Sequence, residues 1–192
     1  MGQKLICTPE TDKVKLVMTQ SLRLQLGVLI SGHSGVGKTA IVRDLARTLG
    51  RHLVCFDCTA STPWGSVARV LSGVAQTGFW GCLKQFNLLA PSSLSIISAQ
   101  LQTLKAALAM RLRSFNFNDT EVRLDPAMAV LATVRPGQVA RTELPLTLTA
   151  LFRPAACAPP DLSLIAAVRL HAMGFANYKV LRSNYQSFFC IR

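Results

Sequence analysis

The sequence predicts an α/β fold in which helices cover both faces of a mostly parallel sheet. Two observations support this. Short apolar runs with the length of buried strands alternate with segments whose apolar residues recur at helical spacing. The first such run, residues 26–31, leads directly into the pattern Gly-x-x-x-x-Gly-Lys-Thr at 32–39, and a helical segment follows. A strand, a glycine-rich turn and a helix in this order are typical of a phosphate-binding P-loop.

The P-loop consists of Gly32, His33, Ser34, Gly35, Val36, Gly37, Lys38 and Thr39. Its glycines allow a tight turn whose N–H groups point at phosphate oxygens, and the following helix N-terminus adds a partial positive charge. Lys38 is placed to reach the β- and γ-phosphates, and the Thr39 hydroxyl is the expected metal ligand if Mg²⁺ binds. His33 occupies a variable position and is expected to be exposed. The motif therefore predicts nucleotide binding, while hydrolysis is a separate question.

The other elements follow from hydrophobic periodicity and from residues that begin or end helices. Thr11 or Asp12 suits the N-cap of the first helix, Gly50 ends the helix after the P-loop, and Pro63 suits a first helical turn. An Asn-Asp pair between two alternating runs is typical of a β-hairpin. In chain order we expect an ordered loop at 6–12 and a helix at about 12–24. Strands are then expected at 26–31, 52–58 and 79–83, with helices between them at 39–49 and 62–76. The remaining expected elements are a helix at 92–113, a hairpin at 115–124, a strand at 129–134, a short helix near 146–152, an irregular strand near 154–160 and a helix at about 161–173.

Length and composition narrow the class of protein. The 192 residues fit one domain, and an apolar content of 50% excludes disorder as a description of the whole chain. Lys and Arg outnumber Asp and Glu by 21 to 9, but the basic residues are scattered, which favours solvated faces and a phosphate site over nucleic acid. We expect no nucleic-acid partner and, because no apolar run approaches the length of a membrane span, no membrane.

The chain divides into three parts by pattern. Residues 1–24 form an N-terminal loop and helix, and residues 25–174 form the P-loop domain. The pattern weakens after Gly174, so residues 175–192 are interpreted as a divergent tail or the truncated start of a further domain.

Six cysteines leave two interpretations open. Only Cys55 and Cys58 have C-x-x-C spacing, and no second pair or nearby histidine completes a zinc set. Zinc or redox chemistry is therefore the weaker interpretation, and reduced core thiols are the stronger one. The N-terminus carries no secretory pattern, which favours a cytoplasmic, reducing environment.

Four stretches together carry a family resemblance. They are Ile-Cys-Thr-Pro-Glu-Thr-Asp at 6–12, the P-loop with its continuation at 42–46, Gly-Val-Ala-Gln-Thr-Gly-Phe-Trp-Gly-Cys at 73–82, and Pro-Gly-Gln-Val-Ala-Arg-Thr-Glu-Leu-Pro at 136–145 followed by Leu-Phe-Arg-Pro at 151–154. Over roughly residues 6–182 the chain resembles the first AAA+ module of dynein heavy chains, which carries the main hydrolytic site.

The resemblance implies a P-loop AAA+ large subdomain with a five-stranded parallel sheet, helices on both faces and the truncated start of a lid. It implies ATP or ADP as ligand, with Thr8 and Pro9 in a loop against the adenine, and Arg153 as an arginine acting on a neighbouring module. A surface salt bridge is the other interpretation of Arg153. The implied partners are neighbouring AAA+ modules of the same heavy chain and, through the parent protein, intermediate and light chains and microtubules. The implied location is the cytoskeleton, including the axoneme of a cilium or flagellum.

Three positions depart from the family pattern. Where the family has Phe-Asp-Glu-Phe-Asn, residues 83–87 read Leu-Lys-Gln-Phe-Asn. Lys84 replaces the aspartate that helps to hold Mg²⁺, Gln85 replaces the glutamate that polarises the attacking water, and Arg135 replaces the sensor asparagine. The catalytic positions are thus degenerate, and two interpretations remain. One is an ATP-binding module that hydrolyses very slowly or not at all; the other is a catalytically dead structural ring segment that binds nucleotide weakly or not at all.

Lys84 carries two interpretations of its own. An ammonium about 4 Å from Mg²⁺ would repel it by about 8 kcal/mol at an effective dielectric near 20, so metal-bound ATP in the usual pose is disfavoured. In the first interpretation, Lys84 replaces the cation and rests on the phosphates with Lys38 and Arg135. In the second, it is a solvated lysine at a strand end with no role in a site.

Overall fold

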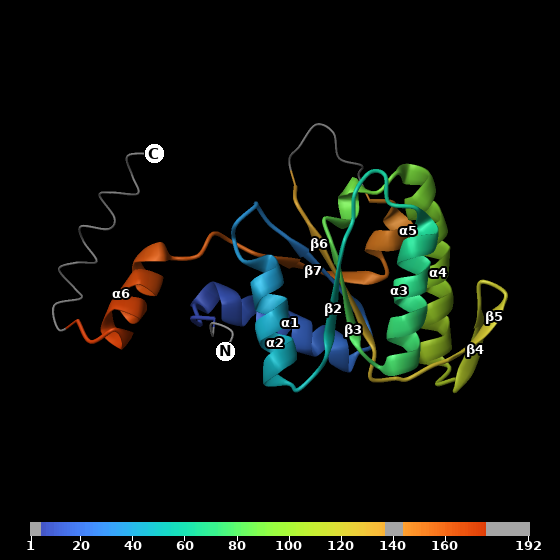
Figure 1. Ribbon diagram of the computed structural model, residues 1–192, viewed down its shortest axis with the longest axis horizontal. Coiled ribbons are helices and arrows are strands. Elements are labelled where there is room, and N and C mark those ends of the chain that lie inside the picture. Colours follow the sequence, from blue (N-terminus) through green and yellow to red (C-terminus); the bar gives the residue numbers. More distant parts are fainter. Residues whose placement is uncertain (1–4, 137–143, 176–192) are drawn as a thin grey trace.

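The centre of the computed structural model is a five-stranded, all-parallel sheet in the order β2-β3-β6-β1-β7 (Figure 1). The structure describes residues 5–136 and 144–175. The strands are β1 (Gly27–Ser31), β2 (Leu53–Asp57), β3 (Trp80–Lys84), β6 (Ala129–Val134) and β7 (Phe152–Ala156). Because all five run in one direction, their carboxyl ends share one edge of the sheet, where ligands bind in open α/β folds. The predicted fold class is confirmed.

Helices cover both faces of this sheet. One face carries α1 (Pro9–Arg23) and α2 (Lys38–Thr48), and the other carries α3 (Trp64–Thr77) and α4 (Pro91–Ala109) (Figure 1). The remaining elements are the 3-10 helix η1 (Phe86–Leu88), α5 (Leu146–Thr149), α6 (Leu162–Ala172) and the hairpin β4 (Ser114–Phe117) with β5 (Thr120–Arg123). The hairpin follows the end of α4, and α6 lies apart from the sheet (Figure 1).

The core has two halves, one on each face of the sheet. The larger half joins α3, α4, η1 and the hairpin, and the smaller half joins α1 and α2. β6 is buried at every position, as expected for the central strand of a parallel sheet covered on both faces. Trp80 on β3 and Phe86 on η1 are core residues, with 4% and 0% of their surface exposed.

The hairpin was predictable in detail. Asn118 and Asp119 form its turn with φ values of 51° and 60°, a conformation that these two residue types tolerate better than most. β4 and β5 pair antiparallel, with Phe115 opposite Val122.

Several predicted boundaries are wrong. α1 begins at Pro9, not near residue 12, because Thr8 is the N-cap: the Thr8 Oγ1 accepts from the Thr11 N–H at 3.3 Å, and the Thr11 Oγ1 accepts from the Thr8 N–H at 2.8 Å. Residues 9–12 are therefore helix rather than loop.

Other elements also differ at their ends. α3 begins at Trp64, which makes Pro63 its N-cap. α4 ends at Ala109, four residues before the expected end, and Met110 beyond it is 69% exposed. β7 begins at Phe152 rather than near residue 154. Most of the expected tail at 175–192 lies outside the described residues, and no helix within the described ranges is long and apolar enough to cross a membrane.

Candidate nucleotide-binding site

The P-loop occupies the carboxyl edge of the sheet, between the end of β1 and the start of α2. Gly37 is the N-cap of α2 and has a φ of 89°, a value that residues with a side chain rarely adopt. A Cβ on Gly32 would lie 2.6 Å from the Cys157 carbonyl oxygen, so this position requires close backbone approach. The backbone that follows β7 supports the loop, because the Cys157 N–H donates to the Ser31 carbonyl at 2.7 Å.

Lys38 folds back over its own loop. Its Nζ donates to the carbonyl oxygens of Gly32 and His33, at 2.6 Å and 2.5 Å. Thr39 follows in the first turn of α2, and His33 is exposed as expected. The loop amides, the Lys38 ammonium and the N-terminus of α2 therefore converge at one place, which is the arrangement that binds phosphate.

A cavity of about 300 Å³ opens beside this loop. Its lining combines P-loop residues with the ends of β2, β3 and β6: Ser34, Gly35, Gly37, Lys38, Thr39, Ala40, Asp57, Lys84, Gln85, Thr133, Val134 and Arg135. The structure thus brings all three departures from the family pattern to the phosphate loop.

Lys84 forms an ion pair that sequence analysis did not foresee. Its Nζ lies 2.8 Å from Oδ1 and 2.9 Å from Oδ2 of Asp57. The two residues are Cα partners at the carboxyl ends of β2 and β3, and their side chains are 71% exposed for Asp57 and 21% for Lys84. Lys84 is therefore paired with a carboxylate in the lining of the cavity and is not an isolated lysine at a strand end. The signal in the sequence was that Asp57 ends one strand as Lys84 ends another.

Buried polar side chains fix the backbone at the other two positions. Gln85 has a φ of 52°, and its N–H donates to the Thr133 Oγ1 at 3.2 Å. The Asn87 side chain is 7% exposed and binds both backbone groups of Arg135. Its Nδ2 donates to the Arg135 carbonyl at 3.0 Å, and its Oδ1 accepts from the Arg135 N–H at 3.5 Å. Sequence analysis missed both supports, since they join residues 48 apart in the chain.

Three expected site residues lie elsewhere. Thr8 is buried as the N-cap of α1, and neither Thr8 nor Pro9 lines the cavity beside the P-loop. Arg153 lies on β7, the edge strand beside β1, where Val28 is its Cα partner. Neither ion pair between described side chains involves Arg153.

Cys55 and Cys58, the C-x-x-C pair, belong to no group of possible metal ligands among the described residues. Within residues 5–136 and 144–175, no group of three or more Cys, His, Asp or Glu side chains is placed to hold a metal. Burial raises the pKa of the Cys58 thiol to about 12. Cys55 on β2 is instead the Cα partner of Cys82 on β3. A hydrogen bond from the Cys82 thiol lowers the pKa of Cys55 to about 6. Arg43 acts in the same direction, and burial acts in the opposite direction.

The donor set of the cavity suits phosphate better than a divalent cation. Lys38, Lys84 and Arg135 bring three cationic side chains to its lining. Among the described residues of the lining, Asp57 is the single carboxylate, and both of its oxygens already contact Lys84. Mg²⁺ prefers carboxylate and phosphate oxygens in near-octahedral geometry, and Thr39 alone does not supply them.

Comparison with known proteins matches almost the whole chain to one family. The family described as the hydrolytic ATP binding site of the dynein motor region matches residues 1–191. Human dynein axonemal heavy chain 10 is 41% identical over 181 residues, which are 94% of this chain and 4% of the relative. The ciliary dynein beta chain of Heliocidaris crassispina is 37% identical over 182 residues, 95% of this chain and 4% of the relative. The chain therefore spans a small part of the length of these relatives.

Solved structures show the same architecture at low sequence identity. A RuvB mutant from Thermotoga maritima superposes with a TM-score of 0.60 at 17% identity, over 85% of this chain and 52% of that one. A putative ATPase from Cytophaga hutchinsonii gives a TM-score of 0.56 at 19% identity, over 88% and 55%. These likenesses support the fold alone.

Proposed function

The chain belongs to the family of dynein heavy-chain ATP-binding regions, and from this premise we propose that it binds ATP or ADP at the P-loop without needing Mg²⁺ and hydrolyses ATP very slowly or not at all. One observation carries the proposal. Lys84 stands at the position that helps to hold Mg²⁺ in the family pattern. It lines the cavity beside the P-loop and contacts Asp57, the only carboxylate among the described lining residues.

Binding follows from groups that remain intact. The P-loop backbone and the N-terminus of α2 supply N–H donors, and Lys38 exchanges two loop carbonyls for phosphate oxygens. Lys84 and Arg135 line the same cavity, where their positive charges would attract the negative charge of a triphosphate. A cavity of about 300 Å³ is at the small end of ligand pockets, which suits the phosphates with the base lying outside.

The residues present do not fit the metal of the family pattern. Mg²⁺ would supply charge neutralisation between the β- and γ-phosphates, with Thr39 as its protein ligand. Lys84 stands where the family pattern has a carboxylate and contacts both oxygens of Asp57, so among the described residues this place offers a divalent cation no free carboxylate.

Slow turnover follows from Gln85. An amide cannot accept a proton, although it can orient a water molecule as glutamine does in small GTPases. Gln85 is exposed at the end of β3, and its backbone is held by Thr133. Water can therefore be positioned, but the charge that polarises it in the family pattern is absent at position 85.

The second candidate function is a structural ring segment without nucleotide. The observation that favours it is that Lys38 and Lys84 already have oxygen partners within the protein. If these contacts exceed what a phosphate offers, the site stays closed.

A titration distinguishes the two functions. Fluorescent ATP and ADP analogues are titrated into the protein with excess Mg²⁺ and then with EDTA, and phosphate release is followed in parallel. We expect binding in both buffers with similar affinity, with release close to the background, and loss of binding in Lys38→Ala. Absence of binding in both buffers would establish the structural function, and rapid Mg²⁺-dependent release would refute both.

The wider role is proposed by analogy with the relatives. As a module of a dynein-like heavy chain, this domain would lie beside neighbouring AAA+ modules in a microtubule motor, with intermediate and light chains bound to the parent protein. The axonemal and ciliary names of the relatives support the axoneme as its location. Arg153 would reach the neighbouring module from the edge strand β7.

A further inference from the structure

A second cavity lies at the far end of the domain from the P-loop. Its volume is about 600 Å³, and it opens where the end of α4 meets the hairpin. Its lining is Gln25, Leu108, Arg111, Leu112, Arg113, Arg123, Leu124 and Pro126. These residues come from the segment after α1, the α4 end, and the start and finish of the hairpin.

Three arginines give this cavity its charge. Arg111, Arg113 and Arg123 are all exposed, and among the described residues none of their side chains makes an ion pair or a hydrogen bond. The neighbouring carboxylates are engaged elsewhere: Glu121 accepts from the Ser114 hydroxyl at 2.6 Å, and Asp125 accepts from the Ala127 N–H at 2.9 Å. The arginine side chains are therefore available to carboxylates from outside the domain.

The floor of this cavity is apolar. Leu108 and Leu124 are 7% and 5% exposed, and Leu112 on the rim is 43% exposed. A ligand that fits must combine negative charge with aliphatic groups. Among the described residues, no aromatic side chain lines the cavity, so this part of the chain supplies none of the stacking platforms on which single-stranded nucleic acids are held.

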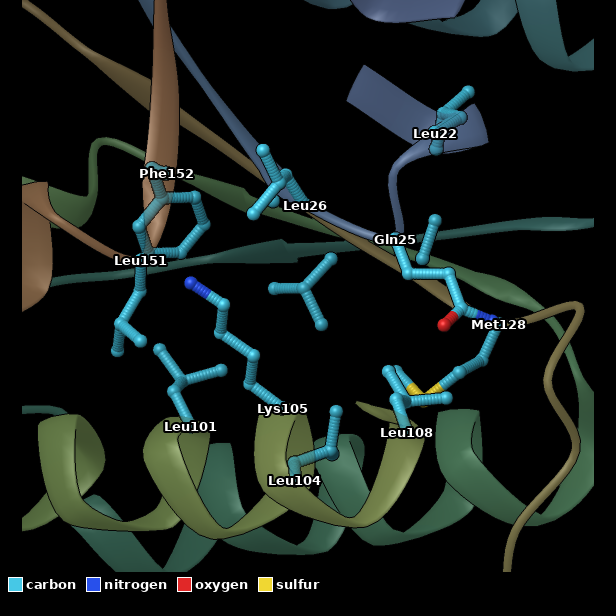
Figure 2. Close-up of a pocket in the computed structure, with 13 residues that line it drawn as sticks. Leu22, Gln25, Leu26, Leu101, Leu104, Lys105, Leu108, Met128, Leu151 and Phe152 are labelled. Atoms are coloured by element: carbon cyan, nitrogen blue, oxygen red, sulfur yellow. The ribbon is translucent and has the colours of Figure 1, made fainter. Parts of the chain in front are cut away.

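A smaller apolar cavity of about 40 Å³ adjoins this arginine-lined cavity and shares the lining residues Gln25 and Leu108 with it. Figure 2 shows Lys105 reaching from α4 across this cavity, between leucine side chains and toward Phe152. Among the described residues, the Lys105 ammonium has no ion-pair or hydrogen-bond partner. The ammonium lies on the Phe152 side of this smaller cavity, away from the Gln25 and Leu108 side that it shares with the arginine-lined cavity (Figure 2), so the charge of the arginine-lined cavity comes from its three arginines.

From this arrangement we propose that the cavity between α4 and the hairpin is a docking site for an acidic, amphipathic protein segment, in which carboxylates alternate with aliphatic side chains. The carboxylates pair with Arg111, Arg113 and Arg123, since guanidinium groups bind carboxylates in bidentate geometry. The aliphatic side chains cover Leu112 and Leu124. The site is remote from the P-loop and does not depend on nucleotide binding.

The test uses the whole 192-residue chain. A fluorescein-labelled peptide of about twelve residues, with glutamates alternating with leucines, is titrated by fluorescence anisotropy. Two further probes are the same peptide with glutamine in place of glutamate, and a single-stranded DNA of equal charge. The triple variant Arg111→Gln, Arg113→Gln, Arg123→Gln is compared with a matched triple variant at exposed arginines outside the cavity, Arg47→Gln, Arg51→Gln, Arg69→Gln. Arg123→Gln alone is a milder second variant, and thermal unfolding checks that all variants fold.

We expect the acidic peptide to bind the parent chain, with at least a tenfold loss of affinity in the cavity variant and less than a twofold loss in the matched variant. Arg123→Gln should give a smaller loss of the same sign. Equal losses in the two triple variants would reduce the effect to net charge and overturn the proposal. Equal binding of the glutamine peptide, or tighter binding of the DNA, would overturn it as well.

Discussion

Replacing Lys84 by aspartate tests the electrostatic reasoning most directly. In the parent chain, the Lys84 ammonium contacts both oxygens of Asp57, at 2.8 Å and 2.9 Å. Because residues 57 and 84 are Cα partners on adjacent strands, Lys84→Asp would put two carboxylates side by side at the mouth of the phosphate cavity. We expect this substitution to convert a site that, on the proposed function, does not hold Mg²⁺ into one that binds it together with ATP.

The magnitude follows from the contact and its exposure. The Asp57 side chain is 71% exposed, so loss of the ion pair costs the fold about 1 kcal/mol at most. Reversal of a unit charge about 4 Å from Mg²⁺ changes their interaction by about 4 kcal/mol even at the dielectric of water. Mg²⁺ dehydrates reluctantly, which consumes part of this gain. We therefore expect a shift of at least about 1.4 kcal/mol, or tenfold in affinity.

The assay is the ratio of ATP dissociation constants in EDTA and in Mg²⁺. We expect a ratio near one for the parent chain and at least ten for Lys84→Asp, with tighter binding in Mg²⁺. Lys84→Gln is the matched control, since it removes the ammonium without adding a carboxylate, and its ratio should fall between the two. An unchanged ratio in Lys84→Asp, or a ratio of ten in the parent chain, would refute the reasoning.

Three further predictions concern stability and thiol chemistry. Gly32→Ala should lower the free energy of unfolding by about 1–3 kcal/mol in urea denaturation, because the added Cβ would lie 2.6 Å from a backbone oxygen. The matched control is Gly73→Ala in α3, whose added Cβ meets nothing within 4 Å, and it should raise the free energy of unfolding by about 0.5–1 kcal/mol. Thr8→Ala removes the N-cap hydrogen bond of α1 and should cost about 0.5–2 kcal/mol; a loss below that range in thermal unfolding would assign the cap little weight. The hydrogen bond from Cys82 lowers the pKa of Cys55 to about 6, so the alkylation rate of Cys55 should rise between about pH 5 and pH 7 and then level off; a rate that keeps rising to pH 9 would contradict this.

The parts of the structure that the sequence predicts best depend on local pattern. The P-loop was predictable because its glycines and the helix after it specify the backbone conformation within eight residues. The hairpin was predictable for the same reason, since Asn118 and Asp119 select its turn. The start of α1 had a local signal too, because a threonine before a proline suits an N-cap, but Thr11 and Asp12 offered an equally plausible cap three or four residues later.

The parts that escaped prediction depend on which strands are neighbours and in which register. Asp57 and Lys84 are 27 residues apart, and only the parallel pairing of β2 with β3 makes them partners. The Asn87 bracket around Arg135 is likewise set by the position of β6 beside β3. Periodicity predicts that such strands exist, but it does not fix the residue that stands opposite each site position.

Under the proposed function, the same distinction would separate nucleotide binding from hydrolysis. Phosphate binding rests on backbone amides, on the N-terminus of α2 and on Lys38, so side-chain changes elsewhere leave it intact. In the family pattern, metal binding and water activation rest on single side chains, and the corresponding positions at the ends of β3 and β6 here are Lys84, Gln85 and Arg135. The buried supports of these positions, Thr133 and Asn87, hold the backbone and not the charge. On the proposed function, this domain keeps a well-formed phosphate site while its electrostatics change from metal binding to direct cationic contact with phosphate.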